Sequence, residues 1–449
     1  MSIATHLIDA YEGTLLAPGD RGWDAARQAF NTDIDQQPAA IAMPADAIDV
    51  ANALRFATRN GLRVAPQRTG HNAGPLGDLD DVLLLKTDAF EGVEIDAGAR
   101  RVRVGAATRW EQVTPRLSEL GLAALHGSSP DVGIVGYSLG GGIGWLARKH
   151  GMQTNAVTAI ELVTADGRLV RADHEHEPEL FWALRGGGGN FGVVTALEFE
   201  IFPIRALYAG ALFFALEQTA DVFHAWTELL PSLPEELTSW ASVLHFPPLP
   251  ELPEAIRGRS FAIVMAAFLG SEAEGRELLR PLRRLRPLMD TFAMQAPAEL
   301  GDLAMDPRAP LPFRSAHALV DALPSAAIED VARISGPGSS LALVQLRHMG
   351  GALTRHEPDA GARATLPGEI CVFGLGVVPE AGAEPAVLSD LAALSAAVAP
   401  RRVGDYPNFV ETPADTSGFF APGTWERLRR VKALYDPQDL FKANHHIPA

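Results

Sequence analysis

The pattern of apolar and polar positions in the first 205 residues predicts short helices and strands in alternation. Between positions 44 and 60, apolar residues recur at three- and four-residue spacing, which predicts an amphipathic helix that stops at Gly61. Strands are expected at 62–65, 82–85 and 193–199, a hairpin at 91–106, a strand pair at 157–170 and a short helix at 178–184. Thr108 and Glu111 have the spacing of a capping box and predict a helix that ends at Gly121.

The pattern changes near position 206. Alanine- and leucine-rich stretches then alternate with proline-rich ones, and apolar strands are expected at 261–268, 341–348 and 369–377. Their spacing is too wide for a simple βαβ repeat, so we predict a separate α+β domain with its own sheet. This divides the chain into 1–205, 206–400 and a C-terminal segment, 401–449, rich in glycine and proline.

Two glycine-rich stretches are the clearest candidates for chemistry. The first expected strand leads into Gln67-Arg68-Thr69-Gly70-His71, a loop that offers several N–H donors close together. Such a concavity suits an anion such as a phosphate, although a plain surface turn has the same composition. The second stretch, 126–151, holds eight glycines, a density that indicates close approach of the backbone to another group.

A third glycine cluster matches the dinucleotide-binding fingerprint only literally. The pattern Gly187-x-Gly189-x-x-Gly192 follows a helix and opens a strand, whereas that fingerprint follows a strand and opens a helix. No Gly-Lys-Ser/Thr ending marks a P-loop. What remains is a pair of backbone loops, 66–77 and 127–144, able to hold one long ligand with a diphosphate.

Composition and charge limit the classes of partner, cofactor and location that fit this chain. A net charge of −17 argues against nucleic acid, and 47% hydrophobic residues argue for packed cores. The single Cys371 lies in an expected strand and excludes a disulfide within the chain or a cysteine-based zinc site. No secretory signal and no membrane-length apolar run is visible, so a soluble, cytoplasmic protein is expected. His174 and His176 lie in an acidic loop, and we expect no metal site there.

Five blocks in order carry a family resemblance. They are VAPQRTGHNAG, SSPDVGIVGYSLGGGIGWLARKHG, FWALRGGGGNFGVV, RHMGGALTR and YDPQDLFKANHHI. Together they resemble the berberine-bridge-enzyme-like FAD-linked oxidases of the vanillyl-alcohol-oxidase type. The resemblance implies an α+β, two-domain PCMH-type FAD-binding fold. Its inserted substrate domain would carry an antiparallel sheet flanked by helices.

The resemblance also implies how FAD is held. His71 corresponds to the histidine joined covalently to the flavin 8α-methyl. Ser129 stands where many relatives have a second, cysteine attachment, so a single covalent bond through His71 is expected. Val132 matches a position associated with oxygen access. The implied cofactor-binding residues are Pro66, Gln67, Arg68, Thr69, Gly70, His71, Asn72, Gly77, Ser128, Ser129, Val132, Gly133, Gly136, Tyr137, Gly140, Gly141, Gly142, Gly144, Trp145, Gly192, Val193, Val194 and Asn444.

The substrate base is less defined by the resemblance. Relatives often carry Tyr-x-Asn-Tyr, whose second tyrosine takes the substrate proton, but this chain has Tyr406-Pro407-Asn408-Phe409. Tyr406 is then either the base or a substrate contact. Gln345, Arg347 and His348 are further candidates, and strand alternation puts Gln345 and Arg347 on one face and His348 on the other. His446 replaces a second tail asparagine, and faces either the flavin or solvent.

The expected activity is that of an FAD-dependent oxidoreductase. It would oxidise an alcohol, amine or activated C–H group of a small organic substrate, such as a sugar or secondary metabolite, and O2 would reoxidise the flavin to give H2O2. Two alternatives are a dehydrogenase with another electron acceptor and a flavin-binding protein that has lost catalysis. A monomer or homodimer is expected, with neither nucleic acid nor membrane as a partner.

Overall fold

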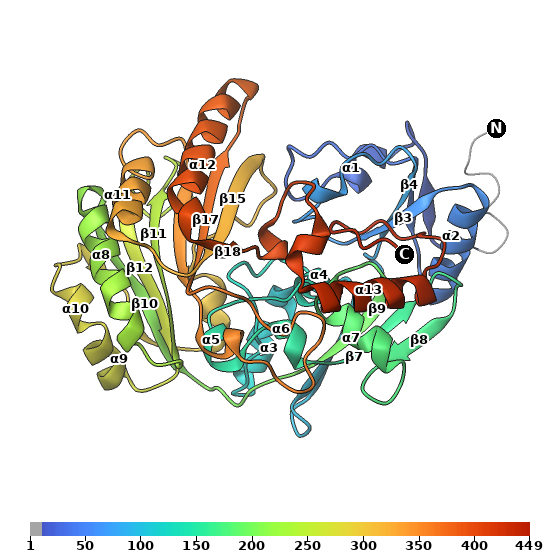
Figure 1. The fold of residues 1–449 in the computed structure, drawn as a ribbon, viewed down its shortest axis with the longest axis horizontal. Helices are drawn as coiled ribbons and strands as arrows, with labels where there is room; N and C mark the ends of the chain where they lie inside the picture. The colour runs from blue at the N-terminus through green and yellow to red at the C-terminus, as the bar shows by residue number, and fades with distance from the viewer. Residues whose placement is uncertain (1–10) are drawn as a thin grey trace.

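The computed structural model describes residues 11–449, in two halves that face each other (Figure 1). The N-terminal segment, from which we expect no secretory signal, begins outside the described residues. The first half holds two small sheets, and the second holds one large antiparallel sheet. Helix α13, near the C-terminus, packs on α7, so the C-terminal segment returns to the first half.

The first half is built from β1–β9 and α1–α7. Its mixed sheet has the order β1-β2-β4-β3, and its antiparallel sheet has the order β5-β6-β9-β7-β8. The strands are β1 (Thr14–Leu16), β2 (Ala40–Met43), β3 (Arg63–Gln67), β4 (Val82–Lys86), β5 (Val93–Asp96), β6 (Arg101–Gly105), β7 (Val157–Val163), β8 (Leu169–Ala172) and β9 (Val193–Glu200). The helices are α1 (Trp23–Arg27), α2 (Ala47–Arg59), α3 (Thr114–Glu119), α4 (Ile134–Leu139), α5 (Ala147–His150), α6 (Gln153–Ala156) and α7 (Pro178–Gly187).

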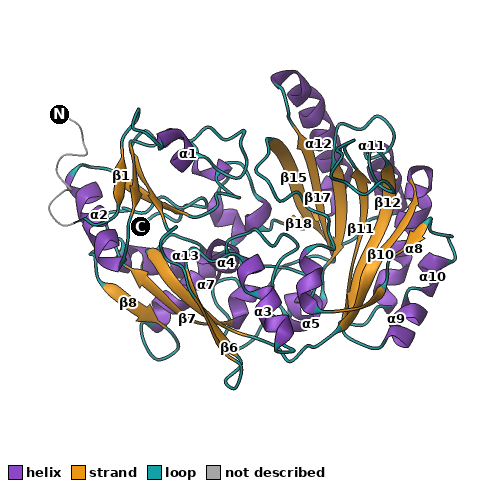
Figure 2. Ribbon diagram, turned by 180° about the vertical axis from the view of Figure 1, so that it is seen from behind, coloured by secondary structure: helices purple, strands orange, loops and turns teal. Residues whose placement is uncertain are grey.

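The large sheet runs in the order β13-β10-β12-β11-β16-β17-β15-β18, with β14 also paired to β10. Its strands are β10 (Leu207–Ala215), β11 (Leu237–His245), β12 (Ser260–Phe268), β13 (Met289–Asp290), β14 (Ala293–Gln295), β15 (Phe313–Val320), β16 (Leu343–His348), β17 (Ile370–Val377) and β18 (Arg402–Gly404). The helices of this half are α8 (Thr219–Leu229), α9 (Glu272–Leu278), α10 (Arg280–Arg283), α11 (Ser325–Ile334) and α12 (Glu384–Val398), followed in the chain by α13 (Pro422–Tyr435). The predicted antiparallel sheet flanked by helices is confirmed (Figure 2).

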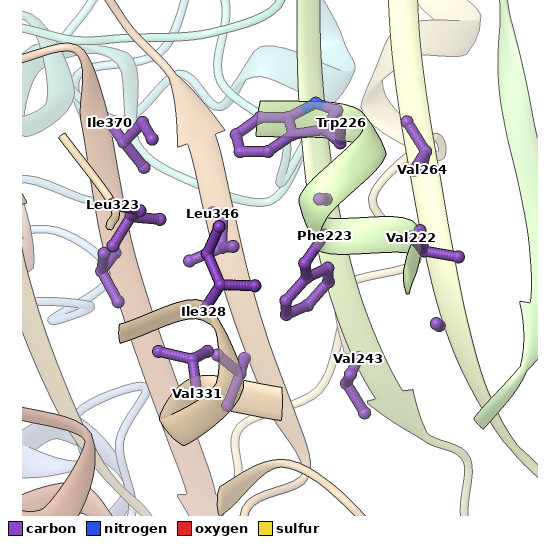
Figure 3. Packing of buried hydrophobic residues seen from close by; sticks show 14 of the residues in the cluster. Val222, Phe223, Trp226, Val243, Val264, Leu323, Ile328, Val331, Leu346 and Ile370 are labelled. Atoms are coloured by element: carbon purple, nitrogen blue, oxygen red, sulfur yellow. The ribbon is translucent and has the colours of Figure 1, made fainter. Parts of the chain in front are cut away.

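The helices cover only the outer face of the large sheet. Phe223 and Trp226 of α8 and Val331 of α11 pack with Leu346 of β16 and Ile370 of β17 (Figure 3). Burying such side chains contributes about 1.5–3 kcal/mol each. Because the helices occupy one face, the other face of the sheet is left to meet the first half of the chain.

Helix α12 also belongs to this outer layer. The stretch Ala381–Arg401 that contains it is long and apolar enough, by length and composition alone, to cross a membrane. Val387, Leu391 and Leu394 instead lie in the core of the large sheet. The apolar content of α12 therefore has a role in packing.

Most of the predicted elements are present in the first half. Helix α2 begins after Asp46, whose side chain accepts hydrogen bonds from two backbone N–H groups, and it ends before Gly61. The capping box expected at Thr108 and Glu111 was wrong. Thr108 Oγ1 donates to the carbonyl of Gly92, and the segment divides into a 3-10 turn and α3. Pro115 explains the division, because proline is tolerated only in the first turn of a helix.

The domain division predicted at 206 and 400 stays a proposal. The large sheet begins with β10 at Leu207, and β18, at Arg402–Gly404, pairs with β15. A boundary placed by sheet membership would thus lie a few residues after position 400. The proposed C-terminal segment then contributes β18 to the large sheet and α13 to the first half.

Candidate active site

A cavity of about 870 Å³ lies where the first half of the chain meets the large sheet. Three glycine-rich segments, at 66–72, 127–140 and 186–192, contribute one side. Strands β11, β16 and β17 and the loop 305–311 contribute the other, and tail segments 406–420 and 443–445 also line it. One continuous cavity therefore reaches both the donor-rich loops and the sheet.

His71 stands on the first glycine-rich loop, just after β3. Gly70 has a φ of +72°, a left-handed conformation that glycine adopts without strain. The imidazole stacks on Phe30 with 3.8 Å between ring centroids, and its Nδ1 lies 2.8 Å from Oγ1 of Thr69. Its Nε2 lies 3.5 Å from Oδ2 of Asp131, which belongs to the second loop. These contacts fix the ring at the cavity wall.

The second loop is connected to the opposite half of the chain through Asp306. The hydroxyls of Ser128 and Ser129 donate to Oδ2 of Asp306 over 2.8 and 2.6 Å. All three residues line the cavity, and Asp306 comes from the loop that leads into β15. Ser129 therefore takes part in a hydrogen bond between the two halves.

The third loop is held by the tail. Asn190 donates from Nδ2 to the carbonyls of Gly187 and His445, each over 2.8 Å. The ammonium of Lys432, on α13, donates to the carbonyl of Asn190 and pairs with Asp436 at 2.6 Å. Lys432 and Asp436 are fully buried, and such a pair is costly to break because it would leave one charge uncompensated. Helix α13 therefore fixes this glycine loop.

On the sheet side, Gln345 and Arg347 point into the cavity from β16. The guanidinium of Arg347 lies 4.0 Å from the ring centre of Trp240 and 4.8 Å from that of Phe409, and it donates from Nε and Nη2 to Oε1 of Gln345. Burial lowers the pKa of Arg347. The Asp306 carboxylate acts on this guanidinium in the opposite direction. Its charge is thus available to a ligand or to a neighbouring anion.

Tyr406 faces three donors. The backbone N–H groups of Gly142 and Ile143 and the side-chain amide of Asn408 donate to its hydroxyl oxygen over 3.0, 3.2 and 2.9 Å. Burial raises the pKa of Tyr406 to about 12, while these donors and Arg347 act in the opposite direction. The hydroxyl therefore holds the backbone at 142–143, and the tyrosine stays protonated near neutral pH.

Glu411 is a second titratable group on the cavity wall. Its carboxylate lies near Ser315, and burial raises the pKa of Glu411 to about 7. Ser315 pairs with Leu375 across β15 and β17, and Leu375 pairs with Leu343 of β16. Directly paired residues share a face of the sheet, so Ser315 lies on the same face as Leu343 and Gln345. Glu411, which is close to Ser315, therefore lies over that face.

Comparisons with known proteins agree with this geometry. A model of the FAD binding domain matches residues 38–173, and a model described as berberine and berberine like matches residues 406–448. The chain belongs to the berberine-bridge-enzyme-like FAD-linked oxidoreductases. FAD is accordingly its cofactor, and it is an FAD-linked oxidoreductase.

The full-length relatives include a nicotine oxidase. (R)-6-hydroxynicotine oxidase from Paenarthrobacter nicotinovorans is 29% identical over 97% of this chain and 96% of the relative. The crystal structure of 6-hydroxy-D-nicotine oxidase from Arthrobacter nicotinovorans superposes with a TM-score of 0.83 at 25% identity, covering 98% of both chains. Glucooligosaccharide oxidase from Acremonium strictum superposes with a TM-score of 0.82 at 22% identity over 100% of this chain and 99% of that one, which shows the shared fold.

Most of the residues that the resemblance implies for FAD line the cavity. They are Pro66, Gln67, Arg68, Thr69, Gly70, His71, Asn72, Ser128, Ser129, Val132, Gly133, Gly136, Tyr137, Gly140, Gly192, Val194 and Asn444. The proposed substrate residues Gln345 and Tyr406 line it as well. The cavity of this berberine-bridge-enzyme-like protein therefore brings together segments more than 300 positions apart.

Six of the implied cofactor residues do not line the cavity: Gly77, Gly141, Gly142, Gly144, Trp145 and Val193. For two of the glycines the reason is packing between protein elements. A Cβ on Gly142 would lie 2.8 Å from Cβ of Gln153, and one on Gly144 would overlap the carbonyl of His126. Trp145 stacks on Trp240 at 3.7 Å, beneath the sheet.

His348 was wrongly placed in the site. It is buried on the outer face of β16, where its ring meets Trp226 edge-on at 6.5 Å between centroids. Burial lowers the pKa of His348 to about 3, so the ring is neutral. His446 does not line the cavity either, since it pairs with Asp439 at 3.0 Å. The histidine of the tail that reaches the cavity is its neighbour, His445.

Sequence reasoning missed Asp131, Asp306, Arg363, Glu411 and His445. Asp131 and His445 sit inside quoted motifs, so a residue-by-residue reading of those motifs would have found them. Asp306, Arg363 and Glu411 belong to no motif, and only the folded chain brings them to the cavity wall.

The residues present fit FAD. Gly136 and Gly189 line the cavity with open space in front of them, so a ligand can approach the backbone there. Several buried polar atoms of the wall lack a partner within the described chain, among them Asn72 Oδ1, His445 Nδ1 and two nitrogens of Arg363. Buried polar atoms normally have hydrogen-bond partners, and a dinucleotide offers both donors and acceptors.

Proposed function

We propose that this protein oxidises a small organic substrate in the cavity between its two halves, with FAD held covalently through His71 and O2 as the electron acceptor. The observation that carries the proposal is the single cavity, which joins the His71 loop to the Gln345 and Arg347 face of the sheet. The relatives named oxidases act on small molecules, which supports the same class of reaction here.

Attachment through one bond is supported by the residues beside His71. The glucooligosaccharide oxidase structure describes FAD bound as 6-S-cysteinyl and 8α-N1-histidyl. This chain keeps a histidine at the cavity wall, but Ser129 has no thiol, and its hydroxyl is already bonded to Asp306. A single covalent attachment, at His71, follows.

Bound FAD supplies hydride acceptance, and the protein supplies binding, orientation and proton transfer. Gln345 and Arg347 offer hydrogen bonds and charge to a substrate over β16. We assign proton acceptance to Glu411 over Tyr406. A group with a pKa of about 7 is a competent base at neutral pH, whereas a tyrosine with a pKa of about 12 is almost entirely protonated.

The sheet wall favours an apolar, ring-bearing substrate over an oligosaccharide. Leu343, Phe373 and Leu375 face the cavity, and hydroxyl-rich sugars need a denser set of polar partners. Similarity to glucooligosaccharide oxidase from Sarocladium strictum, at 34% identity, covers only 40% of this chain, whereas the match to (R)-6-hydroxynicotine oxidase covers 97%. We therefore propose a heteroaromatic or aromatic amine or alcohol.

The covalent bond is tested by acid denaturation of the purified protein. Yellow colour is expected to precipitate with the polypeptide, and His71→Ala is expected to release all of it to the supernatant. His445→Ala serves as a matched control, because it removes another cavity-wall histidine and should leave the colour attached. Complete release from the unaltered protein would sink the covalent proposal.

The reaction is tested with a panel of aromatic amines, aromatic alcohols and oligosaccharides. Peroxide release with an aromatic substrate is expected, together with anaerobic bleaching of the flavin and rapid recolouring in air. Slow recolouring would favour a dehydrogenase with another acceptor. Bleaching only by oligosaccharides would refute the proposed substrate class, and bleaching by nothing in the panel would favour a protein that has lost catalysis.

A further inference from the structure

The two ring nitrogens of His71 face different chemical groups. Nδ1 lies 2.8 Å from the hydroxyl oxygen of Thr69, which can donate or accept a hydrogen bond. Nε2 makes no hydrogen bond within the described chain, and it lies 3.5 Å from a carboxylate oxygen of Asp131, which can only accept when ionised. Stacking on Phe30 prevents the ring from turning freely between these partners.

The side chain of Asp131 makes few other polar contacts within the described chain. Its side chain is 8% exposed, and Oδ1 is buried without a hydrogen-bond partner among the described residues. The nearby guanidinium of Arg68 pairs with Asp88 instead, at 2.6 Å. Within the described chain, His71 is the basic side chain within ion-pairing distance of Asp131. A buried carboxylate with one such neighbour is costly unless that neighbour compensates it.

These contacts decide which nitrogen of a neutral imidazole carries the proton. A lone pair on Nε2 would face the carboxylate and repel it, whereas a proton there is attracted. With the proton on Nε2, Nδ1 keeps its lone pair and accepts the Thr69 hydroxyl hydrogen. Carboxylates that orient histidines in this way are known to fix the ring tautomer.

We infer that Asp131 is a positioning residue for flavin attachment: it holds His71 in the Nε2–H tautomer, so that Nδ1 forms the bond to the 8α-carbon of FAD. This inference rests on the proposed covalent attachment at His71. It adds the residue that orients this histidine for the reaction.

The attachment balances as a two-electron oxidation. The N–C bond forms between Nδ1 and the 8α-carbon, the methyl group loses one proton, and the imidazole loses the proton on Nε2 toward Asp131. The two electrons released remain on the flavin ring system, and O2 removes them with two protons as H2O2. Asp131 contributes by stabilising the positive charge that the ring carries while the bond forms.

The experiment follows covalent attachment in apoprotein that is mixed with FAD in air. Acid-precipitable flavin is measured over time for the unaltered protein, Asp131→Asn and Asp131→Glu. Attachment is expected to slow on the order of 10- to 100-fold in Asp131→Asn, the range typical for loss of a residue that orients a functional histidine. Asp131→Glu keeps the charge and should restore part of the rate.

Two further measurements separate positioning from folding. FAD affinity in a His71→Ala background should change less than about twofold when Asp131→Asn is added, because the imidazole through which Asp131 acts is then absent. The flavin peptide of the unaltered protein should carry its flavin on Nδ1, as identified by NMR. Thermal unfolding of each apoprotein reports whether the variants fold.

The outcomes distinguish the role of Asp131 from the proposed covalent attachment at His71. Equal attachment rates in Asp131→Asn and the unaltered protein, or a flavin on Nε2, would overturn the role of Asp131 and leave the covalent bond intact. A Glu variant no faster than the Asn variant, with weaker FAD binding in both, would also overturn it. Release of all flavin from the unaltered protein would overturn both.

Discussion

The two walls of the cavity are built by different means. The flavin wall consists of backbone loops, and the contiguous segment 66–72 contributes every one of its residues to the cavity. The substrate wall consists of alternate side chains on strands, together with Asp306 and Glu411 from separate loops. Backbone groups hold a cofactor common to a family, whereas side chains can change without disturbing the sheet. Substitutions should therefore affect folding and FAD binding on one wall and substrate oxidation on the other.

The largest effect is expected for Glu411→Gln on the substrate wall. If its carboxylate takes the substrate proton, kcat/KM should fall by on the order of 10²- to 10⁴-fold. In the unaltered protein, kcat/KM should rise with pH through about 7, since the base acts only after it loses its own proton. Steady-state kinetics across pH, with acid-stable flavin as the loading control, checks both statements. A variant that keeps the rise near pH 7 would contradict the assignment.

A pair of glycine substitutions separates packing behind the flavin wall from FAD binding at the wall. Gly144→Ala should destabilise the apoprotein by about 3 kcal/mol or more, because a Cβ there overlaps the carbonyl of His126. Gly136→Ala meets no atom within 4 Å and lies in α4, so it should stabilise the apoprotein by about 0.5–1 kcal/mol. FAD binding to Gly136→Ala should nevertheless weaken. Thermal unfolding and FAD titration of the two apoproteins measure these effects, and equal FAD affinity in Gly136→Ala would count against a cofactor at that position.

Glycine shows why only part of this site is predictable from the sequence. The motifs predicted glycine loops against a ligand, and Gly70, Gly133, Gly136 and Gly140 do line the cavity. Gly142 belongs to the same glycine-rich motif, but there the missing side chain makes room for Tyr137 and Gln153. A sequence shows that no side chain fits at a position, but it does not show whether a ligand or the protein occupies the space.

On the substrate wall, predictability is limited by distance along the chain. Strand alternation correctly separated Gln345 and Arg347 from His348, because it is a local property of one strand. Glu411 lies near Ser315 of β15, which is far from it in the sequence, so nothing local connects them. The fold class was predictable from ordered motifs, whereas the proton acceptor needed the tertiary contacts.

Tyr406 lies between the two walls, and Tyr406→Phe should have an intermediate effect. Loss of the hydroxyl leaves the N–H groups of Gly142 and Ile143 without their acceptor, which should lower the free energy of unfolding by about 1–3 kcal/mol. Covalent flavin should remain, and kcat/KM should fall by about tenfold through displacement of the loop. Chemical denaturation and steady-state kinetics provide the two readouts. A loss of 10²-fold or more at unchanged stability would instead make Tyr406 the base.

The smallest effect on catalysis is expected for His348→Phe, on the outer face of the strand that carries Gln345. The ring lies next to Trp226, away from the cavity, so kcat/KM should stay within about twofold of the unaltered value. Gln345→Leu on the same strand is the matched comparison and should reduce kcat/KM, because it removes the acceptor that orients Arg347.

The stability of the protein at acidic pH, unlike its activity, should change in His348→Phe. The pKa of His348 is lowered from 6.5 to about 3 in the folded protein, so below pH 6.5 the unfolded chain binds the extra proton and the native state loses stability. His348→Phe removes that loss, which amounts to about 2 kcal/mol at about pH 5. Urea unfolding of the two proteins between neutral and mildly acidic pH measures it. A stability difference that does not grow as the pH falls would contradict the lowered pKa of His348, and a kinetic defect as large as that of Gln345→Leu would show that His348 acts on the cavity side.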